Sequence, residues 1–249
     1  MTHKTLLGAG PFYFKGNKTG ILMIPGGGGG TCADLKYIAE DIYNETGYTI
    51  HIPLLPGFGT SPQDLKNTPI NVWKNALDEE IQLLEKQCHK LIVGGHSMGG
   101  ILALILASKY ELDGIFTLSA PIGIKGIGSK LVPFLKIFIK YYPIDSAKFK
   151  KETNDKWVGY DKIPLNQATK MKKLIKQMKQ ILPYIKCPAL LLQGHLDSVI
   201  KTNSMDFIYD KIGSIIKKEL WLENNDHPIL ESPDHDIIVS ELINFVKEI

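Results

Sequence analysis

A serine set between glycines is the clearest candidate for chemistry in this sequence. Ser97 lies in the run GHSMG at residues 95–99, with the apolar stretch LIV before it and ILALILA after it. This order predicts a strand, a tight turn and a helix. A G-x-S-x-G turn in that context is typical of a nucleophile elbow, whose small flanking residues let the serine hydroxyl rise above the strand ends. The competing interpretation is a glycine-rich connection with an incidental serine, and we favour the nucleophile.

A serine hydroxyl needs a base, and that base needs an acid to orient it. On such a sheet the acid and the histidine follow the serine in chain order, each just after a later strand. Asp197 follows the apolar run CPALLLQG, and His227 follows the run KKELWLEN. The sequence therefore predicts a triad of Ser97, Asp197 and His227. Asp226 is the lesser alternative for the acid, because adjacent side chains diverge, and His96 is expected to give only structural support.

Five consecutive glycines follow the first apolar stretch, in MIPGGGGGT. Acyl transfer passes through an oxyanion that preorganised backbone N–H groups stabilise, and a glycine loop offers such groups without side chains in the way. We expect one donor at Met98, directly after the serine, and the other at Gly27, with Gly28 as a neighbour that could replace it and contact the substrate. A phosphate-binding loop is the rival interpretation, but no G-K-[ST] follows and no G-x-G-x-x-G opens a helix.

Apolar runs and amphipathic patterns alternate along most of the chain. They predict strands at 20–25, 48–59, 90–95, 113–121, 187–194 and 217–224, and helices at 33–47, 69–87, 100–110 and 235–249. Continuous Val/Ile/Leu strands separated by helices indicate a mostly parallel central sheet with helices on both faces. Residues 122–182 break this rhythm with lysine-rich helical patterns and no strand. We therefore expect an α/β core made of residues 1–121 and 183–249, with 122–182 as a small helical insertion rather than an independent domain.

Charge is distributed unevenly in a chain of 249 residues whose formal net charge is +3. Its 29 basic residues are all lysines, and 14 of them lie in residues 122–182 against 4 acidic residues. A nucleic-acid-binding protein without arginine would be unusual, so we expect no nucleic-acid partner. Three dispersed cysteines argue against a disulfide framework and a zinc site. No stretch approaches the ~20 apolar residues of a membrane span and no signal peptide is evident, so we expect a soluble, cytoplasmic protein.

Together these segments resemble the α/β-hydrolase family, and more narrowly the small bacterial carboxylesterases related to monoacylglycerol lipases. The resemblance is carried by ILMIPGG, GGHSMGG, LSAP, LLQGHLDSVI and NNDHPIL, and it extends over nearly the whole chain. It implies an α/β-hydrolase fold with Ser97 as nucleophile, Asp197 as orienting acid, His227 as base, and the amides of Gly27 and Met98 as the oxyanion hole. It also implies that the lysine-rich insertion caps the active site and that no metal or organic cofactor takes part.

The glycine loop departs from the pattern of this family. Relatives commonly begin the loop with His-Gly and a bulky residue, whereas this chain has Pro25, Gly26 and Gly27. The histidine of the relatives is usually structural, so its absence need not abolish catalysis. We expect the missing side chain at Gly27 to widen the acyl side of the pocket.

The insertion offers the only clue to the substrate. In the segment LVPFLKIFIKYYP, Phe134 and Phe138 fall near one apolar face and lysines fall near another. This pattern is typical of a helix packed on the core, and equally of an apolar roof over an acyl chain, rimmed by lysines that attract anionic substrates, products or a lipid surface. We expect Phe134 and Phe138 to contact a small-molecule ester substrate. Contact with a lipid surface is expected to be weak, without stable membrane insertion, and the chain to be a monomer or homodimer.

These expectations lead to a serine carboxylesterase that hydrolyses short- to medium-chain carboxylic monoesters through an acyl-enzyme on Ser97. His227 would take the serine proton, give it to the leaving alcohol and then activate the water. A monoacylglycerol lipase or lysophospholipase, a thioesterase and an acyltransferase with the same triad are the alternatives. A non-catalytic ligand-binding relative is a further alternative, against which the intact triad argues.

Overall fold

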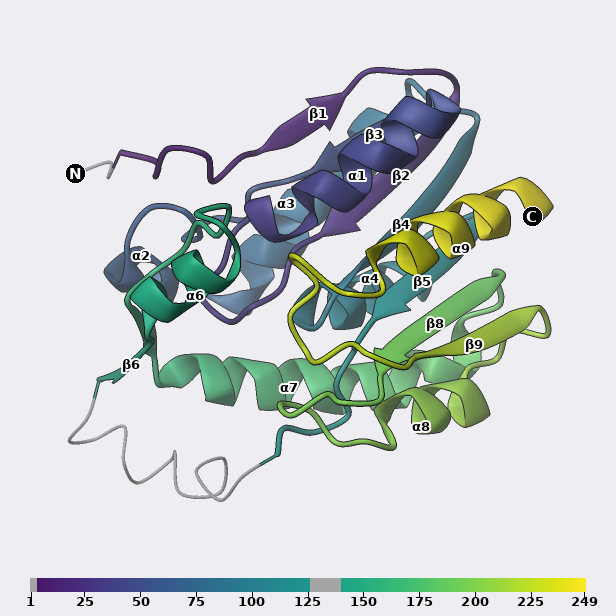
Figure 1. The fold of residues 1–249 in the computed structure, drawn as a ribbon. Coiled ribbons are helices and arrows are strands. Elements are labelled where there is room, and N and C mark those ends of the chain that lie inside the picture. Colours follow the sequence, from purple (N-terminus) through teal and green to yellow (C-terminus); the bar gives the residue numbers. More distant parts are fainter. Residues whose placement is uncertain (1–3, 126–139) are drawn as a thin grey trace.

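A seven-stranded sheet forms the centre of the molecule (Figure 1). The structure is a computed structural model, and it describes residues 4–125 and 140–249. The strand order is β1-β3-β2-β4-β5-β8-β9, in which β1 pairs antiparallel with β3 and every other neighbouring pair is parallel. The mostly parallel sheet expected from the sequence is therefore confirmed.

The strands occupy the apolar runs of the sequence. They are β1 (Phe12–Phe14), β2 (Thr19–Ile24), β3 (Thr49–Ile52), β4 (Lys90–His96), β5 (Gly114–Leu118), β8 (Ala189–Gly194) and β9 (Lys217–Leu222). Every residue of β5 and β8 is buried, because both faces of these central strands are covered. The sequence does not predict β1, since a strand of three residues is too short for its periodicity to show.

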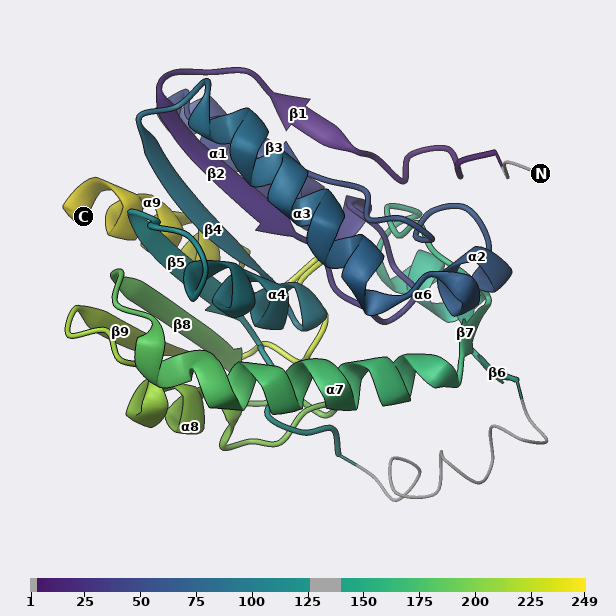
Figure 2. The ribbon, with the colours of Figure 1, turned by 180° about the vertical axis from the view of Figure 1, so that it is seen from behind.

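Helices cover both faces of the sheet, as Figures 1 and 2 show from opposite sides. One hydrophobic cluster joins the sheet to α1 (Ala33–Thr46) and α9 (His235–Glu248). The cluster on the other face includes α3 (Ile70–Glu85), α4 (Met98–Ala107) and α8 (Ser204–Lys211), while the short α2 (Pro62–Asn67) precedes α3. All ten residues of α4 are buried, so this helix has no solvent-facing side.

The helix α7 (Asn166–Ile181) lies across the outer side of α4 (Figure 2). Its residues Leu174 and Met178 are buried in the same hydrophobic cluster as α4, and the 3₁₀ turn η1 (Leu182–Tyr184) returns the chain to β8. The C-terminal helix of the insertion thus packs into the core of the fold.

The prediction that residues 122–182 contain no strand is wrong. Within that segment β6 (Tyr141–Pro143) and β7 (Lys162–Pro164) form an antiparallel pair, and α6 (Ser146–Glu152) lies between them. Each strand has three residues and contains proline, which hides the alternation by which strands are recognised. Phe134 and Phe138, which were expected to contact the substrate, lie outside the described residues.

Among the helices of the described ranges, 4–125 and 140–249, none combines the length and apolar character needed to cross a membrane.

Candidate active site

Ser97 sits on a backbone conformation that few residues adopt. It occupies the single position between the end of β4 and the start of α4, with φ 53° and ψ −115°, which is unusual for an L-residue. A Cβ at Gly99 would lie 1.9 Å from the carbonyl oxygen of Ile24, so glycine is required for this turn to pass so close to β2. The turn is held from the other side as well, because the Ser97 amide donates to the Leu118 carbonyl at 2.8 Å.

The structure brings the three predicted triad residues together. His227 Nε2 lies 3.0 Å from Ser97 Oγ, and His227 Nδ1 lies 2.8 Å from Asp197 Oδ2. Because a carboxylate only accepts hydrogen bonds, Nδ1 carries the proton and Nε2 is left to accept the hydroxyl proton. Asp197 is 1% exposed, while Ser97 and His227 are 8% and 9% exposed at the surface of a cavity. This is the geometry in which imidazole can act as a general base on serine.

The Asp197 carboxylate is held in its charged form by three donors. Burial by itself raises the pKa of Asp197, but the hydrogen bond and charge of His227 and the amides of Ile200 and Val199 outweigh burial, so the pKa is lowered overall. Both amides donate to Oδ1 at 3.0 Å, which leaves Oδ2 for the imidazole. The carboxylate is therefore both fixed in direction and charged, as an orienting acid must be.

Asp226, the alternative acid, faces away from the imidazole ring. Its Oδ1 accepts from the backbone amides of Ser198, at 2.7 Å, and His227, at 2.6 Å, and from the Ser198 hydroxyl, at 2.9 Å. Burial opposes the resulting shift, but these donors lower the pKa of Asp226. Asp226 thus ties the loop before His227 to the loop after Asp197 and does not contact the His227 ring.

His96 supports the backbone of His227, which the sequence suggested only in general terms. Its Nε2 donates to the His227 carbonyl at 2.9 Å, and the two rings lie 4.9 Å apart between centroids. Burial, together with the charge of His227, lowers the pKa of His96 to about 3, so this ring stays neutral. Its Nδ1 is buried without a hydrogen-bond partner.

The glycine loop lies against the turn that carries Ser97. A Cβ at Gly27 would lie 2.7 Å from Met98 Sδ, so the two residues expected to form the oxyanion hole are neighbours. The Met98 side chain fills part of the space left by the missing side chain at position 27. This limits the expected widening of the acyl side of the pocket. Gly28, in contrast, has no atom within 4 Å of a Cβ placed on it, and it lines the cavity.

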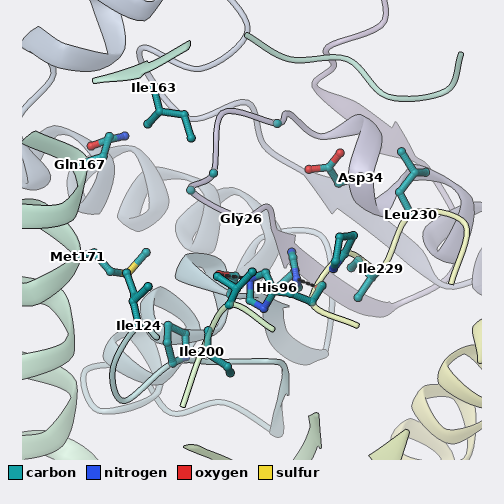
Figure 3. A pocket seen from close by; sticks show the side chains of 18 of the residues that line it. Gly26, Asp34, His96, Ile124, Ile163, Gln167, Met171, Ile200, Ile229 and Leu230 are labelled. Carbon is teal, nitrogen blue, oxygen red and sulfur yellow. Dashed lines mark hydrogen bonds between the residues drawn. The ribbon is translucent and has the colours of Figure 1, made fainter. Parts of the chain in front are cut away.

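A cavity of about 360 Å³ opens beside Ser97 and His227 (Figure 3). Its walls come from the loops that follow β2, β4, β5, β8 and β9, from the first turn of α1 and from the insertion, and they are predominantly apolar. The insertion contributes Ile124, Phe149, Thr153, Trp157, Ile163, Gln167, Ala168 and Met171. Among the described residues no group of three or more His, Cys, Asp or Glu side chains is placed to hold a metal ion.

Two polar residues of this wall, Asp34 and Gln167, were not singled out by the sequence. Asp34 lies in the first turn of α1, where an acidic residue is ordinary, and Gln167 lies in the first turn of α7. Both polar atoms of Gln167 and the Oδ1 atom of Asp34 are buried without a hydrogen-bond partner. No local sequence signal distinguishes such residues from solvated ones, because only the tertiary fold places them at the cavity.

Comparison with known proteins places this arrangement in a family. A carboxylesterase of Bacillus subtilis (strain 168) is 27% identical over 242 residues, covering 96% of each chain. The thermostable monoacylglycerol lipase of Bacillus sp. (strain H-257) is 29% identical over 244 residues, covering 98% of this chain and 96% of the lipase. Both alignments span nearly the full length of the chain, so they include the elbow, the glycine loop and the insertion.

Solved structures with the same fold include proteins described as lipolytic. One from work on the metagenome-derived lipolytic enzymes LipS and LipT is 26% identical, covers 99% of this chain and 100% of that one, and has a TM-score of 0.89. The monoacylglycerol lipase of Paleococcus ferrophilus is 19% identical, with a TM-score of 0.77, and shows the fold alone. The fold is that of the α/β-hydrolases, and the family model described as "Serine aminopeptidase, S33" matches residues 16–234, so the chain belongs to that family.

Proposed function

We propose that the chain is a serine carboxylic ester hydrolase that cleaves short- to medium-chain monoesters through an acyl-enzyme on Ser97. The observation that carries the proposal is the continuous hydrogen-bond chain from Ser97 Oγ through His227 to Asp197, at the wall of an apolar cavity. A structural serine would not need a strained backbone, an imidazole and a buried carboxylate in line. The relatives named carboxylesterase and monoacylglycerol lipase support the same reaction class.

The proposed reaction follows from the positions of these atoms. His227 Nε2 takes the proton of Ser97 as Oγ attacks the ester carbonyl, and the amides of Gly27 and Met98 stabilise the oxyanion. When the intermediate collapses, His227 protonates the leaving alcohol and the acyl group stays on Ser97. Water activated by the same imidazole then releases the acid, and Asp197 keeps the imidazole in the required tautomer throughout.

The size and lining of the cavity support a small apolar acyl group. A volume of about 360 Å³ lies at the lower end of the range for small-molecule sites, roughly 300–1,000 Å³. Ile124, Ile163, Met171 and Ile200 give apolar lining to the cavity that Ser97 also lines. We include the insertion, residues 122–182, in the proposal as the cap that closes this cavity from above.

The test is hydrolysis of a chromogenic ester series of increasing acyl length by the wild type and the Ser97→Ala variant. We expect wild-type activity to be greatest at short to medium length, and the variant to lose at least about 10³-fold in kcat. The Asp226→Asn variant is the matched control, because it alters the neighbouring loop without touching the His227 ring. Activity retained in Ser97→Ala would contradict the proposal. Transfer of the acyl group only to an added alcohol or thiol would favour an acyltransferase. Faster cleavage of thioesters than of oxygen esters would favour a thioesterase.

A further inference from the structure

The glycine loop, residues 26–30, has no side chain of its own to hold it in one conformation. Glycine loses more conformational freedom on folding than any other residue, because it has no Cβ to restrict its backbone. The proposed mechanism nevertheless requires the Gly27 amide at a fixed point, since an oxyanion hole works only when its donors are preorganised. Contacts from other segments must therefore hold this loop in place.

The core of the fold supports the start of the loop. A Cβ at Gly26 would lie 3.0 Å from His96 Nδ1, and a Cβ at Gly27 would lie 2.7 Å from Met98 Sδ. These two glycines thus rest on the end of β4 and the turn that follows it. Gly28 is open, because no atom lies within 4 Å of a Cβ placed on it. A second support is therefore needed beyond Gly28.

The insertion supplies that support at the other end of the loop. The Tyr160 amide donates to the Gly29 carbonyl at 3.0 Å, and within the described part of the chain no other hydrogen bond reaches a carbonyl of the loop. Thr31 follows the loop directly and is fully buried, and its hydroxyl donates to the Val158 carbonyl at 2.8 Å. Two hydrogen bonds thus join the insertion to the chain between Gly29 and Thr31.

The insertion also packs closely on Gly29. A Cβ at Gly159 would lie 2.5 Å from the Gly29 oxygen, so the close approach of the two backbones requires glycine at position 159. A Cβ at Gly29 would lie 3.1 Å from Ile144 and 3.2 Å from Ile163. Figure 3 shows Ile163 beside the loop that starts at Gly26. Gly29 is therefore held by contacts as well as by a hydrogen bond.

The segment of the insertion that holds Gly29 is itself fixed to the core. The buried Tyr160 hydroxyl donates to the Gly57 carbonyl at 2.7 Å and accepts from the Thr60 amide at 2.8 Å. Both partners lie in the loop after β3. Burial raises the pKa of Tyr160, so its hydroxyl keeps the proton that the first bond needs. A line of hydrogen bonds thus runs from the loop after β3 through Tyr160 to Gly29.

We propose that Thr31 and Tyr160 are positioning residues for the oxyanion hole, which hold the glycine loop so that the Gly27 amide points at the reacting carbonyl oxygen. The insertion then takes part in stabilising the transition state, in addition to closing the cavity. Neither Thr31 nor Tyr160 lines the cavity, so their loss should act on the transition state rather than on substrate binding. This inference rests on the proposed ester hydrolase function.

The principal variant is Thr31→Val, which keeps the shape of the side chain and removes its hydroxyl. With the chromogenic ester that the wild type cleaves best, we expect kcat to fall about 10- to 30-fold while KM stays within about twofold. A displaced oxyanion donor costs less than a deleted one, whose loss lowers kcat about 10²- to 10³-fold. Thr31→Ser restores the hydroxyl and should return kcat to within about threefold of the wild type.

Thr49→Val is the matched control at the far end of β3. The Thr49 hydroxyl is also buried, donates to the Asn17 carbonyl at 2.8 Å and accepts from the Gly16 amide at 3.0 Å. The Thr31 hydroxyl likewise accepts from one amide, that of Ala33, at 3.4 Å. Both valine variants should therefore lower Tm to a similar extent. Thr49→Val should leave kcat within about twofold of the wild type.

The oxyanion is tested separately with 1,1,1-trifluorodecan-2-one, whose adduct with a serine carries an oxyanion, and with decan-2-one, which fills the cavity without that charge. In Thr31→Val the Ki of the trifluoro ketone should rise by about the factor by which kcat/KM falls. The Ki of decan-2-one should stay within about twofold. Tyr160→Phe frees the insertion segment from the loop after β3 and should lower kcat about three- to tenfold.

Each outcome supports or overturns the positioning role. Unchanged kcat in folded Thr31→Val overturns it and leaves the hydrolase function intact. A raised KM at unchanged kcat, or equal losses for the two ketones, overturns it in favour of an effect on the shape of the cavity. If Thr31→Val does not fold, unchanged kcat in Tyr160→Phe overturns it. If the wild type cleaves no ester of the series and does not bind the trifluoro ketone, the hydrolase function fails and the positioning role falls with it.

Discussion

Replacing Asp34 by asparagine should stabilise the protein at neutral and alkaline pH and have little effect in acid. The pKa of Asp34 is about 7 in the folded chain, against an ordinary value of 3.8 that the unfolded chain would show. Below pH 3.8 the carboxyl is protonated in both states, so no penalty exists. As the pH rises towards 7 the unfolded chain releases the proton while the folded chain keeps it, so unfolding becomes easier. Above pH 7 the loss is complete and constant.

The magnitude follows from the difference between the two pKa values. One pKa unit corresponds to about 1.4 kcal/mol, so the shift from 3.8 to about 7 sets an upper limit near 4 kcal/mol. The positive end of α1 favours the carboxylate by about 0.3–1 kcal/mol. Asp34 is also only partly buried as a residue, so water screens it in part. We therefore expect Asp34→Asn to gain about 2–3 kcal/mol at pH 8.

The assay is urea unfolding of the wild type and Asp34→Asn at several pH values between about 4 and 8. The difference in free energy of unfolding should be small at the acidic end and grow through the interval up to pH 7. Other titrating groups contribute equally to both proteins and cancel in this difference. Glu40→Gln serves as the control for removal of an exposed charge from α1, and it should change the free energy of unfolding at pH 8 by less than about 1 kcal/mol. A flat difference for Asp34→Asn would refute the assignment of a desolvated carboxyl at this position.

The remaining predictions concern the triad and the turn. Asp197→Asn should lower kcat about 10³- to 10⁴-fold, because the imidazole loses its tautomer, and should also lower Tm, because the folded chain stabilises this carboxylate. Asp226→Asn should cost less than about tenfold in kcat. Steady-state kinetics with thermal melts distinguishes the two. Gly99→Ala should lower the free energy of unfolding by more than about 3 kcal/mol in urea, because its Cβ would meet the Ile24 carbonyl oxygen, while Gly28→Ala, which has open space, should cost less than about 1 kcal/mol. Equal losses in the two glycine variants would contradict the packing described for the turn.

The proximity of the three triad residues could be predicted from the sequence, because the topology of a parallel sheet determines it. Ser97, Asp197 and His227 each follow a strand whose neighbours are parallel, so their positions share one edge of the sheet. Strand order need not be known for that inference, since the carboxyl ends of parallel strands point the same way. The catalytic roles of the three residues remain predictions that the kinetics above test.

What the sequence did not reveal depends on contacts between distant segments. The strands β6 and β7 pair with each other across 18 intervening residues, and neither shows a strand pattern alone. Met98 fills space at Gly27 only because the glycine loop packs on the turn after β4. Asp34 resembles any acidic residue of a first helical turn until Gly30 and Leu230 are seen around it.

The polar groups of the site differ in whether the protein itself supplies their hydrogen-bond partners. Asp197 receives three hydrogen bonds and His96 Nε2 has an acceptor, so these supports need nothing from a ligand. Asp34 Oδ1, in contrast, is buried, and no hydrogen-bond donor of the described chain reaches it. The buried carboxyl of Asp34 should therefore lower the free energy of unfolding at any pH where the unfolded chain ionises it. Asp34→Leu should therefore raise the free energy of unfolding at pH 8, as Asp34→Asn should, and urea unfolding measures both.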